Sequence, residues 1–332
     1  MALISMEAIT TKDFQTTVES DPLLLGIEIG GSKLQLVAAA APMRAIRRQR
    51  LSVDRAAGAG AIQGHIKTAL ANWGDTRWRA VGVGFGGPVD WRAGRIGCSH
   101  HVDGWTGVDL QEWLLKLTGA PVAVENDSNL AALAEARYGA GAGFNPVFYT
   151  NSGSGVGGGL IVDGQIYHGA PPGEAEIGHV RLAPGGPTVE DRCSGWAVDR
   201  KIRERCARES SGELARLAAE TRGGEARHLA AALAAGDTAA KQILEETAGD
   251  LAFALSHVVH LFHPAVIVLG GGLSLVGEPW RAGVARALPA NLMAVFRPGP
   301  AVRLAALGED VVPAGALALA ASLEVKKSNS HD

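Results

Sequence analysis

Short apolar runs that end in glycine, proline or polar residues recur along the chain. Leu23–Ile29 is the first such run, and residues 33–40 follow after only three intervening positions. Further runs occupy residues 81–87, 147–150 and 266–269. Apolar runs of this length, rich in β-branched residues and bounded by glycine, are typical of buried strands. The pattern therefore predicts a series of buried strands, the first two of which form a hairpin across a glycine turn.

A second hairpin is predicted further along the chain. A strand at 160–162 is followed by Asp163-Gly164 and by another strand at 165–167. Asp-Gly between apolar strands is a strong signal for a tight hairpin turn. The preceding residues 151–159 read Asn-Ser-Gly-Ser-Gly-Val-Gly-Gly-Gly and satisfy the pattern GxGxxG. A strand follows where a dinucleotide-binding fold requires a helix, so this pattern is not a Rossmann fingerprint.

Helical spacing first becomes clear after residue 129. Apolar and small residues then recur at intervals of three and four, at Leu130, Leu133, Ala134 and Tyr138. Residues 195–262 are rich in alanine, leucine and charge and predict a helical block, whose longest helix is 239–262. An alanine-rich helix is expected at 311–325, and Gly315 inside it indicates close packing where this helix crosses another element.

Length and composition are those of a globular protein of two lobes. The chain has 332 residues, which exceeds the usual size of a protein with a single hydrophobic core. Its 47% hydrophobic and 20% charged residues are ordinary for a globular protein. A formal net charge of -3 and the lack of a long basic run give no indication of nucleic-acid binding. No segment has the pattern of a signal peptide or a membrane span, so we expect a cytoplasmic protein without a membrane partner. Residues 1–22 and 326–332 are expected to be disordered.

Polar residues gather where the apolar residues 122–124 end and the helix begins. Residues 125–129 read Glu-Asn-Asp-Ser-Asn. These residue types are preferred at helix N-caps, so a purely structural role is one interpretation. The other interpretation is that this polar stretch, at the junction of a strand and a helix, carries the chemistry of the chain.

The glycine-rich turns predict phosphate binding. The segment Gly30-Gly31-Ser32-Lys33 resembles a Walker A loop but fails its order of residues, and a strand follows it instead of a helix. Exposed amides of such a turn can still hold an anion, although a simple Gly-Gly turn is an equal alternative. Residues 153–157 form a chemically similar turn, and the two could hold one polyphosphate from both sides. Glycines 270–272 follow a strand, where a planar base or ribose can lie against the backbone.

The loop 173–179 carries the residue types that bind sugar hydroxyls. Glu176 and His179 lie in it, and Glu190 follows eleven residues later. Carboxylates and an imidazole can pair with several hydroxyl groups, whereas a solvated acidic loop is the alternative. The loop 99–107 supplies His101 and Asp103 as further candidates, with a surface loop as the alternative.

Taken in order, these motifs resemble the ROK family, which groups repressors, open reading frames and sugar kinases. The motifs are Ile27-Glu28-Ile29-Gly30-Gly31-Ser32-Lys33, Glu125-Asn126-Asp127, Gly153-Ser154-Gly155-Val156-Gly157-Gly158-Gly159, Glu176-Ile177-Gly178-His179 and Val268-Leu269-Gly270-Gly271-Gly272. The resemblance covers roughly residues 23–325. It implies an α/β protein of the actin-like ATPase (ribonuclease H-like) fold, in which two lobes enclose a ligand cleft. The N-terminal lobe would comprise 23–140 plus 311–325, and the C-terminal lobe 141–310.

The resemblance implies an ATP- and Mg²⁺-dependent hexose kinase that transfers the γ-phosphoryl group to a sugar hydroxyl, usually that on carbon 6 of a hexose such as glucose. Asp127 would be the general base, and we expect it to be a weak base because the helix dipole favours its ionised form. Glu28 would contact Mg²⁺ through water. The implied sugar-binding residues are Gly87, His101, Asn126, Asp127, Glu176, His179 and Glu190. The implied ATP- and phosphate-binding residues are Gly30, Gly31, Ser32, Lys33, Gly153, Ser154, Gly155, Gly157, Gly270, Gly271 and Gly272. Homodimers are common in the family.

The chain departs from the family pattern in three places. The family zinc motif, with three cysteines after the Gly-His pair, is missing: residues 180–194 contain only Cys193, so no structural zinc is expected. Residues 101–105 read His-Val-Asp-Gly-Trp instead of the Asn-x-Pro-Gly-Trp of glucose kinases. Only about twenty residues precede the first glycine turn, too few for the DNA-binding module of family repressors. The alternatives are a catalytically silent sugar-sensing regulator and a polyphosphate-dependent glucokinase.

Overall fold

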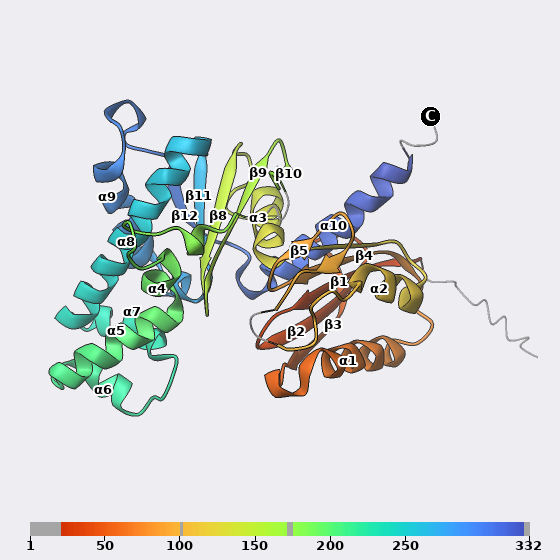
Figure 1. Cartoon of the computed structure of the whole chain (residues 1–332), viewed down its shortest axis with the longest axis horizontal. Helices are drawn as coiled ribbons and strands as arrows, with labels where there is room; N and C mark the ends of the chain where they lie inside the picture. The colour runs from red at the N-terminus through yellow and green to blue at the C-terminus, as the bar shows by residue number, and fades with distance from the viewer. Residues whose placement is uncertain (1–20, 100–101, 171–174, 329–332) are drawn as a thin grey trace, which may run out of the picture.

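The computed structural model describes residues 21–99, 102–170 and 175–328, and its main feature is two five-stranded sheets (Figure 1). The strand order is β3-β2-β1-β4-β7 in the first sheet and β10-β9-β8-β11-β12 in the second. In each sheet three antiparallel strands are followed by two parallel ones. The same strand arrangement therefore occurs twice, as the α/β prediction of an actin-like fold requires.

The first sheet and its helices are formed by the N-terminal part of the chain. The strands are β1 (Leu23–Ile29), β2 (Lys33–Ala39), β3 (Ala45–Ser52), β4 (Trp78–Phe85) and β7 (Val122–Asn126), with a separate small pair, β5 (Val89–Asp90) and β6 (Arg95–Ile96). The helices are η1 (Arg55–Ala57), α1 (Gly58–Asn72), α2 (Leu110–Thr118) and α3 (Asp127–Tyr138). α1 and α2 carry apolar residues at helical spacing, and these residues pack against the sheet in one hydrophobic cluster.

The C-terminal part of the chain forms the second sheet, and the helical block lies between its strands β10 and β11 in the sequence. Its strands are β8 (Val147–Ser152), β9 (Val156–Val162), β10 (Gln165–Ile166), β11 (Val266–Gly270) and β12 (Ala301–Leu304). The α-helices are α4 (Val189–Cys193), α5 (Gly195–Arg208), α6 (Glu213–Ala219), α7 (Leu229–Ala234), α8 (Thr238–Phe262), α9 (Glu278–Ala287) and α10 (Val311–Ser328). The short 3₁₀ turns are η2 (Ile177–His179), η3 (Glu225–His228), η4 (Gly272–Val276), η5 (Leu288–Asn291), η6 (Ala294–Phe296) and η7 (Gly308–Asp310).

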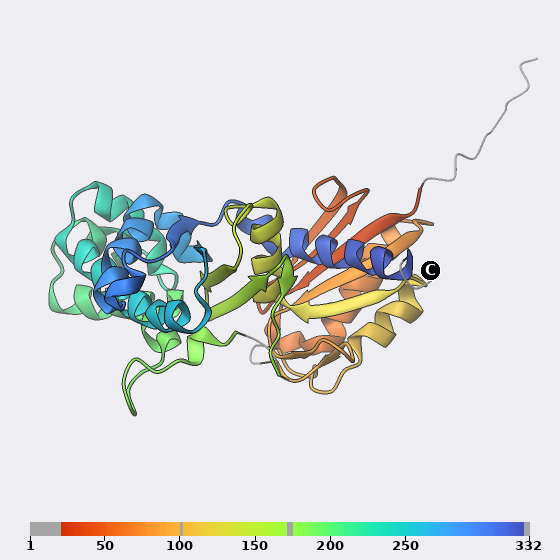
Figure 2. The same ribbon diagram turned by 90° about the horizontal axis from the view of Figure 1, so that it is seen from above.

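Two helices connect the sheets. α10 lies along the first sheet against β1 and β4, and it crosses α3, which in turn packs on β8 and β9 (Figure 1 and Figure 2). The crossing depends on glycine. A Cβ atom on Gly315 would lie 2.1 Å from the carbonyl oxygen of Leu130, and one on Gly82 would lie 1.9 Å from that of Ala316. The close packing predicted for Gly315 is therefore confirmed.

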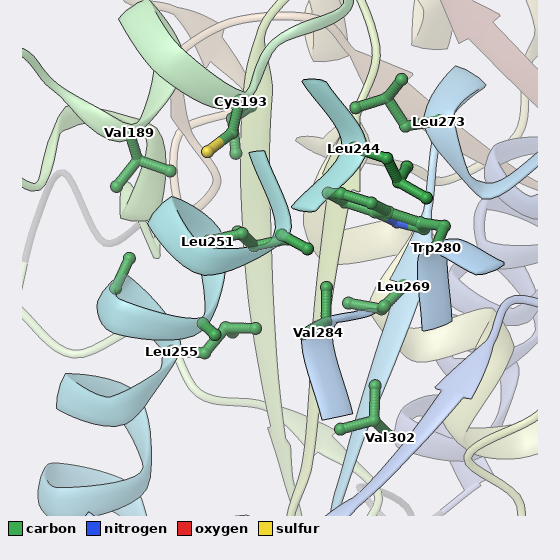
Figure 3. Close-up of a cluster of buried hydrophobic side chains, with 14 of the residues drawn as sticks. Val189, Cys193, Leu244, Leu251, Leu255, Leu269, Leu273, Trp280, Val284 and Val302 are labelled. Carbon is green, nitrogen blue, oxygen red and sulfur yellow. The ribbon is translucent and has the colours of Figure 1, made fainter. Parts of the chain in front are cut away.

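The second sheet is covered by α8 and α9, whose buried side chains form the largest apolar cluster. Trp280 of α9 lies against Leu269 of β11 and the apolar face of α8 (Figure 3). α8 begins one residue before the predicted helix and ends at Phe262, because His263 adopts a positive φ of 48° and closes the C-terminus. α10 continues to Ser328, whereas disorder was expected from residue 326; residues 1–20 and 329–332 lie outside the described residues.

Candidate active site

Asn126 and Asp127 stand at the junction of β7 and α3, and they have different roles there. Oδ1 of Asn126 caps α3 by accepting hydrogen bonds from the backbone N–H groups of Ser128 at 2.8 Å and Asn129 at 3.2 Å. Its Nδ2 donates to the carbonyl oxygen of Gly87 at 3.2 Å. The helix cap is therefore Asn126, and the carboxylate of Asp127 is not needed for it.

Asp127 lies between the two glycine-rich turns. A Cβ atom on Gly86 would lie 3.2 Å from Oδ2 of Asp127 and 3.7 Å from Cα of Gly30 in the first turn. Ser128 packs against the second turn, because a Cβ atom on Gly157 would lie 2.2 Å from its Oγ. The same Oγ donates to Oδ1 of Asp127 at 3.3 Å. The carboxylate of Asp127 therefore lies beside Gly86 and the first turn, and its neighbour Ser128 packs on Gly157, where β9 leaves the second turn.

The pKa of Asp127 is raised from 3.8 to about 6. Burial is the largest cause and the negative charge of Glu28 adds to it, whereas hydrogen bonds from Ser128 act in the opposite direction. The expectation that this carboxylate is a weak base is wrong in direction, because burial raises its pKa by more than the hydrogen bonds of Ser128 lower it. Asp127 is still mostly ionised at pH 7 and is a better proton acceptor than an exposed aspartate.

Glu28 lies on β1 beside the first turn and is 6% exposed. Its Oε1 is 3.1 Å from Nζ of Lys33, and its Oε2 accepts a hydrogen bond from Nε2 of Gln35 at 2.8 Å. Burial raises the pKa of Glu28, although both neighbours act against this. The negative charge of Glu28 raises the pKa of Asp127, and carboxylate oxygens are the ligands that a hard cation such as Mg²⁺ prefers. The contact to Mg²⁺ through water stays a prediction.

The first glycine turn is closed by its own backbone and supported by a side chain that the sequence analysis did not single out. The N–H of Gly30 donates to the carbonyl oxygen of Lys33 at 2.9 Å, and Ser32 lies between them at the tip. Nε of Arg55, in η1, donates to the carbonyl oxygen of Gly31 at 2.8 Å. Arg55 therefore lies against the predicted phosphate site.

The second glycine turn, between β8 and β9, borders a cavity of about 450 Å³. Gly153, Ser154 and Gly272, all predicted to bind ATP, line this cavity. Apolar side chains from η4 and from the segment around η3 complete it: Leu273, Leu275, Val276, Ala226 and Ala230. Gly270 and Gly271 lie behind the turn, since a Cβ atom on Gly271 would lie 2.6 Å from the backbone of Ser152.

The predicted sugar-binding residues come from different elements of the fold. Glu176 and His179 have half-exposed to exposed side chains, with Oε2 and Nε2 3.8 Å apart, and the charge of Glu176 contributes to the raised pKa of Asp127. Glu190 belongs to α4 and contacts the end of the second turn, where its Oε2 accepts a hydrogen bond from the N–H of Val156 at 2.9 Å. His101 lies outside the described residues. The sugar contacts of these residues stay predictions.

Residues 180–189 form a small hairpin that leads into α4. Arg181 and Thr188 make an isolated antiparallel bridge, and the N–H of Val189 donates to the carbonyl oxygen of Val180 at 2.9 Å. Thr188 and Asp191 form a capping box at the start of α4. Described residues contain no group of three or more His, Cys, Asp or Glu side chains placed to hold a metal ion.

The sequence model of the ROK family matches residues 24–322. A glucokinase from Halalkalibacterium halodurans is 27% identical over 332 residues, which cover 94% of this chain and all of that protein. A glucokinase from Thermotoga maritima is 34% identical over 206 residues, which cover 60% of this chain but only 65% of that protein.

A crystal structure of a ROK family glucokinase from Streptomyces griseus, in complex with glucose and AMPPNP, superposes with a TM-score of 0.78 at 29% identity. The superposition covers 90% of this chain and 99% of that one. These similarities confirm the actin-like ATPase fold that the motifs predicted. Within the described ranges, no helix is long and apolar enough to cross a membrane.

Proposed function

This chain belongs to the ROK family, and from this premise we propose that it is a sugar kinase that transfers the γ-phosphoryl group of ATP to the hydroxyl on carbon 6 of a hexose such as glucose. The observation that carries the proposal is the position of Asp127 between two glycine-rich turns. A carboxylate there can accept the proton of a sugar hydroxyl while backbone amides of the turns hold the donor phosphates.

The raised pKa of Asp127, about 6, supports its role as general base. Phosphoryl transfer passes through a loose transition state, so the acceptor oxygen needs orientation and late removal of its proton more than strong activation. Ser128 holds one oxygen of the carboxylate, and the other is directed toward Gly86 and the first turn. Asn126, Glu176 and His179 are the proposed contacts to the other sugar hydroxyls.

The cavity beside the second turn supports ATP as the donor. Leu273, Val276 and Ala230 give it apolar walls, which suit an adenine ring, and Arg227 and Asp199 also line it. Mg²⁺ would supply charge neutralisation at the phosphates, and Glu28 is the residue that would hold it through water. We further propose that the lobes 23–140 plus 311–325 and 141–310 close over the sugar and exclude water.

An assay of sugar phosphate formation across hexoses and N-acetylhexosamines, with ATP or polyphosphate as donor, tests the proposal. Glucose or a close relative should be phosphorylated with ATP and Mg²⁺, and the product should carry phosphate on carbon 6. No turnover with any sugar and either donor would indicate the sugar-sensing regulator instead. Turnover with polyphosphate alone would leave the kinase but overturn the choice of donor. Light scattering of the purified protein would test the expected homodimer.

A further inference from the structure

Arg55 connects the first glycine turn to the rim of the nucleotide cavity. Its Nε donates to the carbonyl oxygen of Gly31 at 2.8 Å. Its Cζ lies 5.8 Å from the ring centre of Trp196, a residue at the start of α5. Trp196 is 52% exposed and lines the cavity together with Gly153 and Ser154 of the second turn. The guanidinium group is therefore placed between the two turns, on the expected path of the donor's phosphates.

The charge of Arg55 is available, in contrast to that of two nearby arginines. Arg48 and Arg50 on β3 form ion pairs with Asp310 and Glu309. Within the described residues, no Asp or Glu forms an ion pair with Arg55, whose side chain makes one hydrogen bond, to a backbone carbonyl, and one contact with an indole face. Both contacts leave the Nη1 and Nη2 donors of the guanidinium fork unused.

We propose that Arg55 binds the polyphosphate of the donor nucleotide, as an additional phosphate-contacting residue contributed by the N-terminal part of the chain. This inference rests on the proposed sugar kinase function. The bond from Nε to Gly31 fixes the fork beside the first turn, and the face of Trp196 holds it while the donor is absent. When the donor binds, charge-assisted hydrogen bonds to phosphate oxygens replace the cation–π contact, which is weaker at an exposed site.

The test compares the binding of three probes by isothermal titration calorimetry: MgAMPPNP, magnesium tripolyphosphate and adenosine. The variants are Arg55→Ala, Arg55→Lys and Arg303→Ala. Arg303 is the matched control, because it is also exposed, lies over an aromatic ring (Phe144, 4.4 Å) and donates to a backbone carbonyl (Ala140, 3.2 Å), but it lies on β12 away from both turns.

Arg55→Ala should weaken the binding of MgAMPPNP and tripolyphosphate about 10- to 100-fold, the range for loss of charge-assisted hydrogen bonds, and leave adenosine binding unchanged. Arg55→Lys should lie between wild type and Arg55→Ala, because it keeps the charge and loses the fork. Arg303→Ala should bind all three probes like wild type.

Wild-type affinity of Arg55→Ala for tripolyphosphate would overturn the inference, as would an equal loss of adenosine binding, which would indicate a general disturbance of the cavity. These outcomes are independent of the proposed reaction. If no sugar is phosphorylated, the proposed function fails while the anion-binding result still stands. If sugar is phosphorylated and Arg55→Ala has a normal KM for ATP, only this inference fails.

Discussion

The carboxylate of Glu125 and the imidazole of His168 meet between the two sheets, with Oε2 and Nε2 2.6 Å apart. Glu125 belongs to β7 of the first sheet, and His168 follows β10 of the second. Oε1 of Glu125 accepts hydrogen bonds from the N–H of Asn126 and from Nδ2 of Asn129. The ring of His168 stacks on Trp91 at 4.1 Å. A contact between the sheets therefore supports the residue that caps α3.

His168→Ala should weaken sugar binding through this contact. Without the imidazole, one oxygen of the buried Glu125 carboxylate loses its partner, and Asn126 is held less firmly. We expect the KM for the sugar to rise about 5- to 20-fold, in line with the cost of an unsatisfied buried group, and the KM for ATP to change little. His65→Ala, on the exposed side of α1, is the control and should be silent. A rise in the KM for ATP of the same size would show a global effect instead.

Asp127→Asn should lower kcat about 10²- to 10⁴-fold, the usual contribution of general base catalysis, and retain much of the sugar affinity. The asparagine can still hydrogen-bond the hydroxyl but cannot accept its proton. Asp109→Asn is a matched control, because Asp109 accepts from the N–H of Glu112 as the cap of α2. Nearly normal turnover of Asp127→Asn would mean that this carboxylate has only a structural role.

The pH dependence of the reaction should report the same carboxylate. Asp127 must be ionised to act as a base, so kcat/KM for the sugar should fall about tenfold per pH unit below pH about 6, its raised pKa. The profile of Asp127→Asn should lack this limb. Initial rates between pH 4.5 and 8, with ATP saturating, give the measurement. A wild-type profile that stays flat down to pH 4.5 would assign the proton to another acceptor.

Stability should depend on pH in the opposite sense. Because the folded-state pKa of Asp127 lies above 3.8, its contribution to stability is fully present below pH about 4 and is lost as the pH rises through about 6. Asp127→Asn removes this cost, so it should raise the free energy of unfolding more at pH 8 than at pH 5. The ceiling is about 3 kcal/mol, at about 1.4 kcal/mol per pKa unit, and solvent access to the carboxylate lowers it. Urea unfolding at both pH values is the measurement.

The glycine turns and the junction at Asp127 could be predicted because their residues carry the signal locally. β3 could not, since its residues 45–52 are exposed or half-buried and have no apolar face. It is a strand because it pairs with β2 and because Arg48 and Arg50 meet Asp310 and Glu309 from a distant part of the chain. Charged residues on an edge strand look like a loop in the sequence.

The contacts between the two sheets also could not be predicted from the sequence. Glu125 and His168 are 43 positions apart, and neither residue type indicates its partner. Arg55 was missed for the same reason, because its meaning depends on Gly31 and Trp196 being brought to one place. For Glu190 the motif gives a sugar contact, which stays a prediction, and it gives no sign of the hydrogen bond that Oε2 of this carboxylate accepts from the N–H of Val156. A motif identifies residue types in order, but burial and tertiary contacts decide where a side chain is directed.

The fold and the activity of this protein should not require zinc. Three contacts stabilise the loop 180–194 without a metal ion. They are the bridge between Arg181 and Thr188, the capping box of Thr188, and the contact of α4 with α8. In this last contact, Nε of Arg192 donates to Oδ2 of Asp250 at 2.9 Å. Cys193 faces inward, where its Sγ donates to the carbonyl oxygen of Thr247 at 3.6 Å.

Zinc binds the thiolate, and burial raises the pKa of Cys193 to about 12, so this thiol is a poor ligand in its observed position. Elemental analysis should therefore find well under one zinc per chain, and EDTA followed by Mg²⁺ alone should restore full activity. Thr188→Ala, which removes the cap, should lower the free energy of unfolding by about 1 kcal/mol, whereas Thr68→Ala on the surface of α1 should not. About one zinc per chain, with activity that returns only when zinc is added, would show that residues 180–194 bind metal in a conformation different from this one.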